Sequence, residues 1–240
     1  MTNQQWIFFL IPGSGDRDKE LRNSRRRYSI TLIGVVLYLV LDIIAQLLPP
    51  HYSPISQAES DLAVGPYGFV MTVNFLNRGV LSLEFLFALL GTARIAGAEV
   101  SRMRTGKFLF GAWSVGAILL AIFPTDVPAT PVSWHGLIHL VVAIVAFLGG
   151  AFGALALSLR LRGSPKLEAI RSFALLIAAI SVVLCLVDLL LPAHLAAHYG
   201  GLFERLFLGS VLVWVAAISV YMLRSQPDTA PPPVASSSGP

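Results

Sequence analysis

The residues of this chain best suited to chemistry are histidines and acids that border its apolar segments. His135 and His139 are four residues apart, so a helix would stack both imidazoles on one face, as a metal or haem site requires. His194 and His198 repeat this spacing, and Asp126 precedes the first pair. Zinc takes three or four N, S or O ligands, which makes these five residues candidate zinc ligands. The alternative is that they only hydrogen-bond to neighbouring groups, since no HExxH pattern is present.

A second polar group lies within the apolar segments themselves. Asn74, Arg78 and Ser82 follow a four-residue spacing and share one face of a helix. Arg78 lies roughly 13 Å along that helix, near mid-bilayer, where a charge costs on the order of 2.5 to 3.5 kcal/mol. We therefore expect it to face other helices and to pair with Asp42 or Asp188. The pair would fix helix register, or the guanidinium would bind an anion such as phosphate or carboxylate.

Further acids lie in the longest loop and in the last apolar segment. Glu59 and Asp61 flank Ser60 and supply groups for acid and base catalysis, or alternatively cap a helix. Glu204 and Arg205 are adjacent, so we expect one to point into the bundle and the other towards the interface. The candidate ligand-pocket residues are then Asp42, Asn74, Arg78, Asp188, Glu204 and Arg205.

The elements that position these residues must cross a membrane. The 240 residues are 55% hydrophobic and only 12% charged, whereas a soluble domain has roughly a quarter of its residues charged. About 20 apolar residues span the hydrocarbon core as a helix, which satisfies its own backbone polar groups. Six stretches are long enough: 29–48, 69–93, 107–123, 135–158, 171–191 and 202–223. We predict an all-α membrane protein with six transmembrane helices.

The distribution of charge predicts the topology. All but two of the 17 Lys and Arg residues fall at one end of the predicted helices, and the five histidines fall at the other. By the positive-inside rule both termini are cytoplasmic, and the helices form three outward hairpins with loops 49–68, 124–134 and 192–201. The exceptions are Arg78 and Arg205. The net charge of +4 then reflects contact with an anionic inner leaflet and no nucleic acid partner.

The chain divides into a basic cytoplasmic segment (1–28), a six-helix domain (29–223) and a tail (224–240). The tail is rich in Pro and Ser, and we predict that it is disordered. The apolar run at 6–11 lacks a preceding basic region and a cleavage site, so we do not interpret it as a signal peptide. Cys185 is the only cysteine, so no intrachain disulfide forms.

Four segments carry a family resemblance. They are ISQAESDLAVGPYGFVMTVNFLNRG at 55–79, FPTD at 123–126, HGLIH at 135–139 and GLFER at 201–205. Together they resemble the bacterial and archaeal membrane family catalogued as domain of unknown function 998, over residues 28–223. The resemblance implies a multi-pass protein of the prokaryotic cytoplasmic membrane and implies no activity.

Three functions are compatible with these residues. One is an outward polar pocket that binds an anionic lipid or a small amphiphile. Another is an intramembrane hydrolase acting on a lipid, with zinc on the histidines and Glu59 or Asp61 as the base. The third is an electron carrier that binds haem through two histidines on facing helices. No Walker, Rossmann or Gly-x-Ser-x-Gly pattern supports an ATPase, a dinucleotide enzyme or a serine hydrolase.

Overall fold

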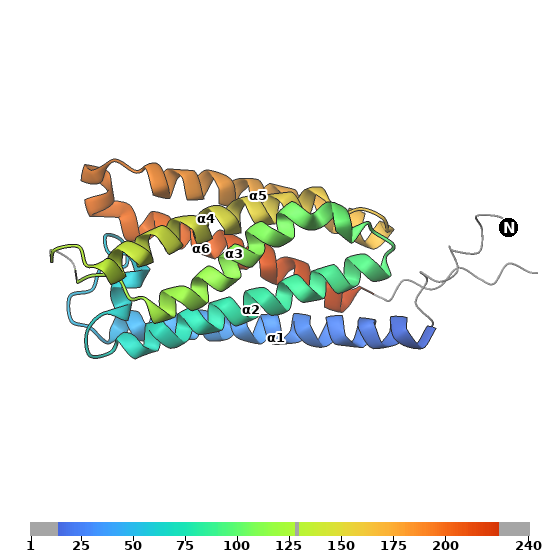
Figure 1. Ribbon diagram of the computed structural model, residues 1–240, viewed down its shortest axis with the longest axis horizontal. Helices are drawn as coiled ribbons and strands as arrows, with labels where there is room; N and C mark the ends of the chain where they lie inside the picture. Colours follow the sequence, from blue (N-terminus) through green and yellow to red (C-terminus); the bar gives the residue numbers. More distant parts are fainter. Residues whose placement is uncertain (1–13, 128–129, 226–240) are drawn as a thin grey trace, which may run out of the picture.

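The computed structural model describes residues 14–127 and 130–225 (Figure 1). These residues form six long helices and two short 3-10 helices, and none of them lies in a β-strand. The helices are α1 (Ser14–Leu47), η2 (Glu59–Ala63), α2 (Gly68–Ile95), η3 (Val100–Met103), α3 (Arg104–Ile122), α4 (Trp134–Leu159), α5 (Pro165–Leu190) and α6 (Ala193–Arg224). All six α-helices are long and apolar enough to cross a membrane, which confirms the predicted class. The apolar run at 6–11 and the tail from 226 lie outside the described residues.

The helices form one elongated bundle with two distinct ends (Figure 1). Each helix packs against its neighbours in sequence, and α1 also packs against α6. The α1–α2, α3–α4 and α5–α6 connections lie together at the end that we call the histidine end, because the five histidines lie there or in the adjoining helical turns. The α2–α3 and α4–α5 connections lie at the opposite end, which we call the arginine end.

Two helices begin well before their predicted boundaries. α1 begins at Ser14 rather than Ser29, because the basic stretch is rich in good helix formers and its residues Glu20 and Ser24 pack against α2. Its 34 residues make it about 51 Å long, so its first turns extend beyond a hydrocarbon core of about 30 Å. α6 begins at Ala193 rather than Leu202, so most of the third predicted loop is helical.

An aromatic cluster fills the centre of the bundle. The ring of Trp214 lies 5.0 Å from that of Phe85 and 5.4 Å from that of Phe110, between centroids. The indole Nε1 of Trp214 donates a hydrogen bond of 2.9 Å to Ser158 Oγ, which satisfies the one polar atom of that side chain. Such internal partners are required because lipid supplies none.

Glycines bring α3 and α4 into close contact. A Cβ atom at Gly153 would lie 2.6 Å from the backbone nitrogen of Phe110, and one at Gly149 would lie 2.5 Å from the carbonyl oxygen of Leu109. Membrane helices commonly pack through small residues in this way. The contact fixes α3 against α4 and thereby positions Trp113 relative to His139.

Candidate functional site

A pocket of about 240 Å³ at the histidine end gathers several of the predicted residues, and we call it the histidine-end pocket. Its polar side chains are Ser60, Arg78, Thr125, His139, Asp188 and Glu204. Its apolar wall is Ala58, Phe75, Leu120, Leu140, Ala143, Ile144, Phe147 and Leu189. At about 30 Å³ per water molecule this space equals about eight waters. The pocket brings together residues from α2 to α6.

Arg78 is the most deeply buried charged residue of the pocket, with 1% of its surface exposed. Its guanidinium carbon lies 4.8 Å from the ring centroid of Trp113 and 5.2 Å from that of Phe75. Such cation–π contacts contribute about 0.5 to 2 kcal/mol each. The nitrogens Nε and Nη2 have no hydrogen-bond partner among the described residues. The side chain is therefore held by aromatic rings while its hydrogen-bonding capacity is largely unused.

The expected ion pair of Arg78 is not formed, so that prediction was wrong. No salt bridge in the described part of the chain includes Arg78. Asp42 instead accepts a hydrogen bond of 2.6 Å from Gln46 Nε2, one turn along the same helix. Asp188 lines the pocket and forms neither a hydrogen bond nor a salt bridge with a described residue. The guanidinium of Arg78 therefore contacts the rings of Phe75 and Trp113 and no described acid.

The predicted polar face of α2 is confirmed. Asn74, Arg78 and Ser82 are all buried within the bundle. The Asn74 amide donates a hydrogen bond of 3.3 Å to the carbonyl oxygen of Tyr38, and Ser82 Oγ accepts one of 3.1 Å from Trp113 Nε1. Asn74 and Ser82 therefore join α2 to α1 and α3, and neither lines the pocket.

Of the two acids of the first loop, Glu59 contacts other protein groups. Glu59 is buried, accepts a hydrogen bond of 2.5 Å from the Tyr38 hydroxyl and donates its backbone N–H to Glu204 Oε2 at 2.9 Å. Burial raises the pKa of Asp61 above its ordinary value. Neither acid caps a helix, because η2 and α2 begin without a side-chain cap. Glu59 lies behind the pocket wall and positions Glu204, while Ser60 faces the pocket.

Glu204 and Arg205 point in different directions, as predicted. Glu204 lines the pocket, whereas Arg205 donates hydrogen bonds to the carbonyl oxygens of Pro54 (3.0 Å) and Gln57 (3.1 Å) and to the Tyr52 hydroxyl (2.6 Å). Arg205 therefore holds the first loop against α6. It is absent from the pocket lining among the described residues, so its part is to support the wall.

Asp126 and His139 are each occupied by a neighbouring group. Asp126 accepts hydrogen bonds from the backbone nitrogen (2.9 Å) and the hydroxyl (2.5 Å) of Ser133, and these bonds hold its pKa below the ordinary value. Ser133 in turn caps α4. The Nδ1 atom of His139 lies 2.8 Å from the carbonyl oxygen of Phe123. Both residues fix the α3–α4 connection, and His139 also faces the pocket.

The remaining histidines do not complete a metal shell. His135 is exposed and its ring lies against that of Trp134. His194 and His198 are exposed on the first turns of α6, where His198 Nδ1 bonds to the His194 carbonyl oxygen at 2.9 Å. Over residues 14–127 and 130–225, no group of three or more His, Cys, Asp or Glu could hold a metal ion. Because α6 begins at Ala193, His194 and His198 lie on a helix rather than in the predicted loop 192–201.

A family model described as a protein of unknown function, DUF998, matches residues 32–221. The chain belongs to the DUF998 family. The match confirms the resemblance and runs from within α1 to within α6, so it includes the whole histidine-end pocket. No curated protein and no solved structure matches the chain significantly. The protein is thus a multi-pass DUF998 membrane protein.

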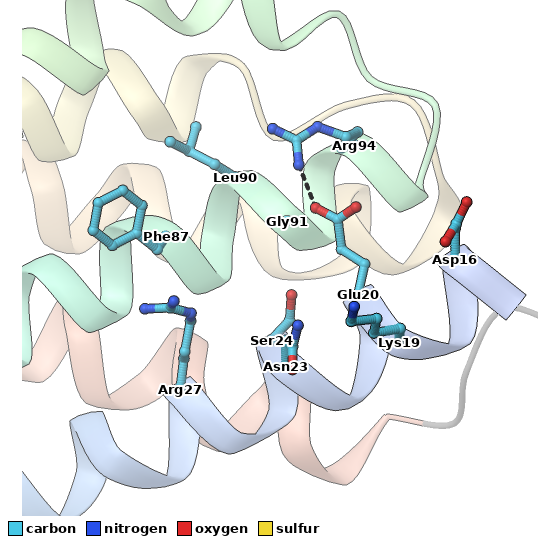
Figure 2. Close-up of a pocket in the computed structure, with 10 residues that line it drawn as sticks. All are labelled: Asp16, Lys19, Glu20, Asn23, Ser24, Arg27, Phe87, Leu90, Gly91 and Arg94. Atoms are coloured by element: carbon cyan, nitrogen blue, oxygen red, sulfur yellow. Dashed lines mark hydrogen bonds and ion pairs between the residues drawn. The ribbon is translucent and has the colours of Figure 1, made fainter. Parts of the chain in front are cut away.

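The DUF998 protein has a second, larger cavity at the arginine end, of about 550 Å³, which we call the arginine-end cleft (Figure 2). It lies between α1 and α2 and is lined by Asp16, Lys19, Glu20, Asn23, Ser24, Arg27, Phe87, Leu90, Gly91 and Arg94. Glu20 forms an ion pair with Arg94 across it. From the sequence we place its α1 residues in the basic segment 1–28 and its α2 residues in or just after the apolar segment 69–93, and the pairing of α1 with α2 is not apparent from composition.

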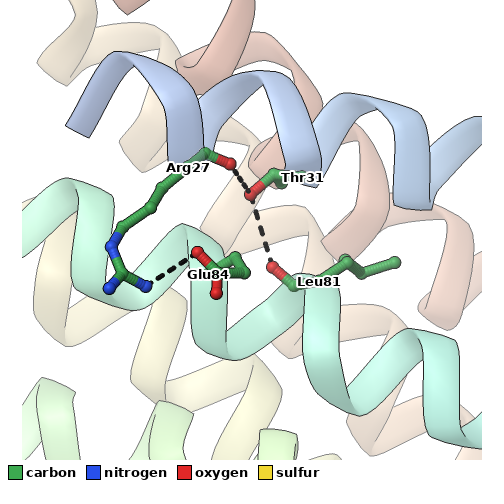
Figure 3. Close-up of polar contacts among 4 residues, drawn as sticks. All are labelled: Arg27, Thr31, Leu81 and Glu84. Carbon is green, nitrogen blue, oxygen red and sulfur yellow. Dashed lines mark hydrogen bonds and ion pairs between the residues drawn. The ribbon is translucent and has the colours of Figure 1, made fainter. Parts of the chain in front are cut away.

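An ion pair between α1 and α2 borders the cleft and gives Glu84 a partner that the sequence did not indicate (Figure 3). Arg27 Nη1 donates to Glu84 Oε2 at 2.7 Å. Beside it, Thr31 Oγ1 lies 2.9 Å from the carbonyl oxygen of Arg27 and 3.4 Å from that of Leu81. These contacts join α1 to α2 near the arginine end of the apolar segments.

Proposed function

We propose that this DUF998 protein binds a small amphiphile, or the headgroup of a lipid, in the histidine-end pocket. The observation that carries the proposal is Arg78, a buried guanidinium with two unpartnered nitrogens beside a cavity. A buried charge without a partner is destabilising by several kcal/mol, and charged residues within membrane segments commonly mark ligand or ion sites. Guanidinium binds phosphate and carboxylate well, so we assign the anionic group of the ligand to Arg78.

The size and position of the pocket favour an amphiphile over a soluble metabolite. A volume of about 240 Å³ is below the roughly 300 to 1,000 Å³ of sites that enclose a whole drug-sized ligand. Leu140 and Ile144 of α4 line the pocket and are also 55% and 37% exposed on the outside of the bundle. The pocket therefore extends to the surface that faces lipid. We assign the polar head to the pocket and the apolar chain to that surface.

Hydrogen-bonding groups at the pocket wall add selectivity. Asp188 and Glu204 supply acceptor oxygens, and Ser60 and Thr125 supply hydroxyls. A simple anion would leave these acceptor oxygens without donors, whereas a ligand with hydroxyl or amine donors would satisfy them. We therefore expect an amphiphile with both an anionic group and hydrogen-bond donors to bind better than inorganic phosphate.

The sidedness of the pocket is also inferred. The concentration of Lys and Arg at the arginine end supports a cytoplasmic position for that end, under the positive-inside rule. We infer that both termini are cytoplasmic, that the three hairpins point outward and that the pocket opens towards the outer leaflet. The membrane is then the prokaryotic cytoplasmic membrane.

Thermal unfolding of the full chain in phosphatidylcholine nanodiscs tests this function. We expect dodecyl phosphate to raise Tm and the matched uncharged dodecyl glucoside to raise it less, because ligands that bind only the folded state stabilise it. In Arg78→Gln the advantage of the phosphate should be lost. The matched control is Arg160→Gln, which removes the same charge from an exposed position at the arginine end. Equal shifts for both amphiphiles in wild type, or an undiminished phosphate shift in Arg78→Gln, would contradict the proposal.

A further inference from the structure

The arginine-end cleft has a charge pattern that differs from that of a simple anion site. Its cations are Lys19, Arg27 and Arg94, and its acids are Asp16 and Glu20. Arg94 is neutralised by Glu20, and Arg27 bonds Glu84 through Nη1 alone. Within the described chain, Asp16 and Lys19 form no ion pair. The cleft therefore contains a positive and a negative side chain without ion-pair partners. This pattern is suited to a ligand that has both a negative and a positive group.

The cleft arises from how closely the two helices approach. A Cβ atom at Gly91 would lie 2.5 Å from Ser24 Oγ, so the two helices touch at this point. Glu20, Ser24 and Arg27 lie on the face of α1 that meets α2, at helical spacing. The glycine brings the backbones together and leaves the longer side chains around it, as Figure 2 shows.

The position of the cleft indicates that its ligand is a lipid. Arg27 immediately precedes the apolar run of α1, and Asp16 lies three turns further from it. Phe87, 53% exposed on α2, and Leu90 line the side of the cleft that adjoins the apolar segments. The guanidinium carbon of Arg27 lies 5.2 Å from the Phe87 ring centroid. The cleft thus spans the boundary between headgroups and hydrocarbon, and one wall is suitable for an acyl chain.

We propose that the arginine-end cleft binds the headgroup of an aminophospholipid such as phosphatidylethanolamine. The phosphate, which lies next to the glycerol and chains, contacts Arg27 and Lys19. The primary amine, which lies further into water, contacts Asp16 and the carboxylate of Glu20. Among the charged residues that α1 contributes to the cleft, Arg27 lies nearest the apolar run and Asp16 lies furthest from it, as the phosphate and the amine are ordered in the lipid. Asn23 and Ser24 lie between Glu20 and Arg27 along α1 and supply neutral hydrogen-bond partners.

The test is the affinity of the delipidated full chain in detergent for phospholipids with matched acyl chains. We expect phosphatidylethanolamine to bind more tightly than phosphatidylcholine, whose quaternary amine donates no hydrogen bond, and than phosphatidylglycerol, which lacks an amine. Lys19→Gln and Asp16→Asn should each lower the affinity for phosphatidylethanolamine roughly tenfold. Both residues are exposed, so neither change removes a buried contact. Arg26→Gln, an exposed change on the same helix outside the cleft lining, should have no effect.

Several outcomes would overturn the assignment. Equal affinity for phosphatidylglycerol would identify a plain anion site, and equal affinity for phosphatidylcholine would show that the amine is not recognised. Equal affinity for free phosphoethanolamine would identify a soluble ligand. Unchanged binding in both Lys19→Gln and Asp16→Asn would place the lipid elsewhere on the protein.

Discussion

The two cavities lie at opposite ends of one bundle and treat their arginines differently. In the arginine-end cleft, Arg27 and Arg94 each form an ion pair with an acid on the neighbouring helix. In the histidine-end pocket, Arg78 is more deeply buried, yet it contacts aromatic rings and no described acid. A paired arginine joins two helices and keeps only some of its hydrogen-bond donors available for a ligand. An unpaired buried arginine contributes little to the stability of the fold and keeps most of its hydrogen-bond donors available.

The charged side chains of the two cavities therefore have different roles. At the arginine end the acids Glu20 and Glu84 belong to the contact between α1 and α2, and ligand binding adds to a structure that is already satisfied. At the histidine end, Asp188 and Arg78 remain separate although both line one cavity. We expect the histidine-end pocket to be less stable when empty and to gain more from its ligand. Each of the following changes tests this difference.

The largest effect is expected for Arg205→Gln, which removes the support of the pocket. The change deletes hydrogen bonds to the carbonyl oxygens of Pro54 and Gln57 and to the Tyr52 hydroxyl. Hydrogen bonds from a charged donor contribute about 1.5 to 3 kcal/mol each. Both carbonyl bonds share the donor Nη1, and the side chain is only half-buried, so we expect a loss of unfolding free energy equal to one or two such bonds, about 3 kcal/mol. Hydrogen exchange should rise in residues 52–63 and stay unchanged at the arginine end. Unchanged exchange in that loop would show that Arg205 does not hold it.

Arg78→Met should change the free energy of unfolding in the opposite direction. Removing a buried, unpaired charge should stabilise the empty protein by about 2 kcal/mol, even though two cation–π contacts are lost. Urea unfolding in mixed micelles measures the change. A destabilised Arg78→Met protein would mean that the guanidinium is satisfied in the absence of a ligand, and the contrast between the two cavities would fail.

In Glu84→Gln the arginine end, like the histidine end, contains an arginine without an ion-pair partner. Arg27 then loses its ion-pair partner at a position where its side chain is 39% exposed and that of Glu84 is 25% exposed. Because of this partial exposure we expect a loss of about 1 kcal/mol, well below the 3 to 5 kcal/mol typical of fully buried pairs. The same unfolding measurement detects it. Restoration of wild-type stability in Arg27→Gln/Glu84→Gln would confirm that the unpaired charge is responsible.

The smallest effect is expected in the pH dependence of stability that arises from Asp126. Its pKa is lowered in the folded protein by the bonds from Ser133, so their contribution is present above the ordinary pKa near 4 and is lost as pH falls through the folded pKa. Ser133→Ala should raise the pKa of Asp126 towards that ordinary value. The Tm difference between wild type and Ser133→Ala should therefore be largest above about pH 5 and shrink in acid. A difference that does not vary with pH would assign the effect to helix capping alone.

Much of the architecture follows from simple periodicities. Stretches of about 20 apolar residues predict six helices, and the spacing of Asn74, Arg78 and Ser82 predicts the buried face of α2. The topology places Arg78, His139, Asp188 and Glu204 at one end, where the pocket gathers them. These predictions succeed because lipid leaves the chain few alternatives.

What the sequence could not indicate depends on contacts between distant segments. The missing partner of Arg78 results from the packing of α3, which places Trp113 against the guanidinium. The ion pair of Arg27 with Glu84 requires the first turns of α1, which were predicted to lie outside the helix. The expected zinc shell rested on residue spacing and on all five candidates lying at one end of the helices, whereas α6 holds His194 and His198 in exposed positions.

The central claim is that Arg78 is kept unpaired for a ligand, and the most direct test is the affinity of one anionic amphiphile for two variants. The dissociation constant of dodecyl phosphate should be measured for wild type, Arg78→Gln and Arg160→Gln in the same nanodiscs. The account predicts at least a roughly tenfold weaker affinity for Arg78→Gln, equivalent to about 1.4 kcal/mol, and no change for Arg160→Gln. Equal affinity of all three proteins would contradict it.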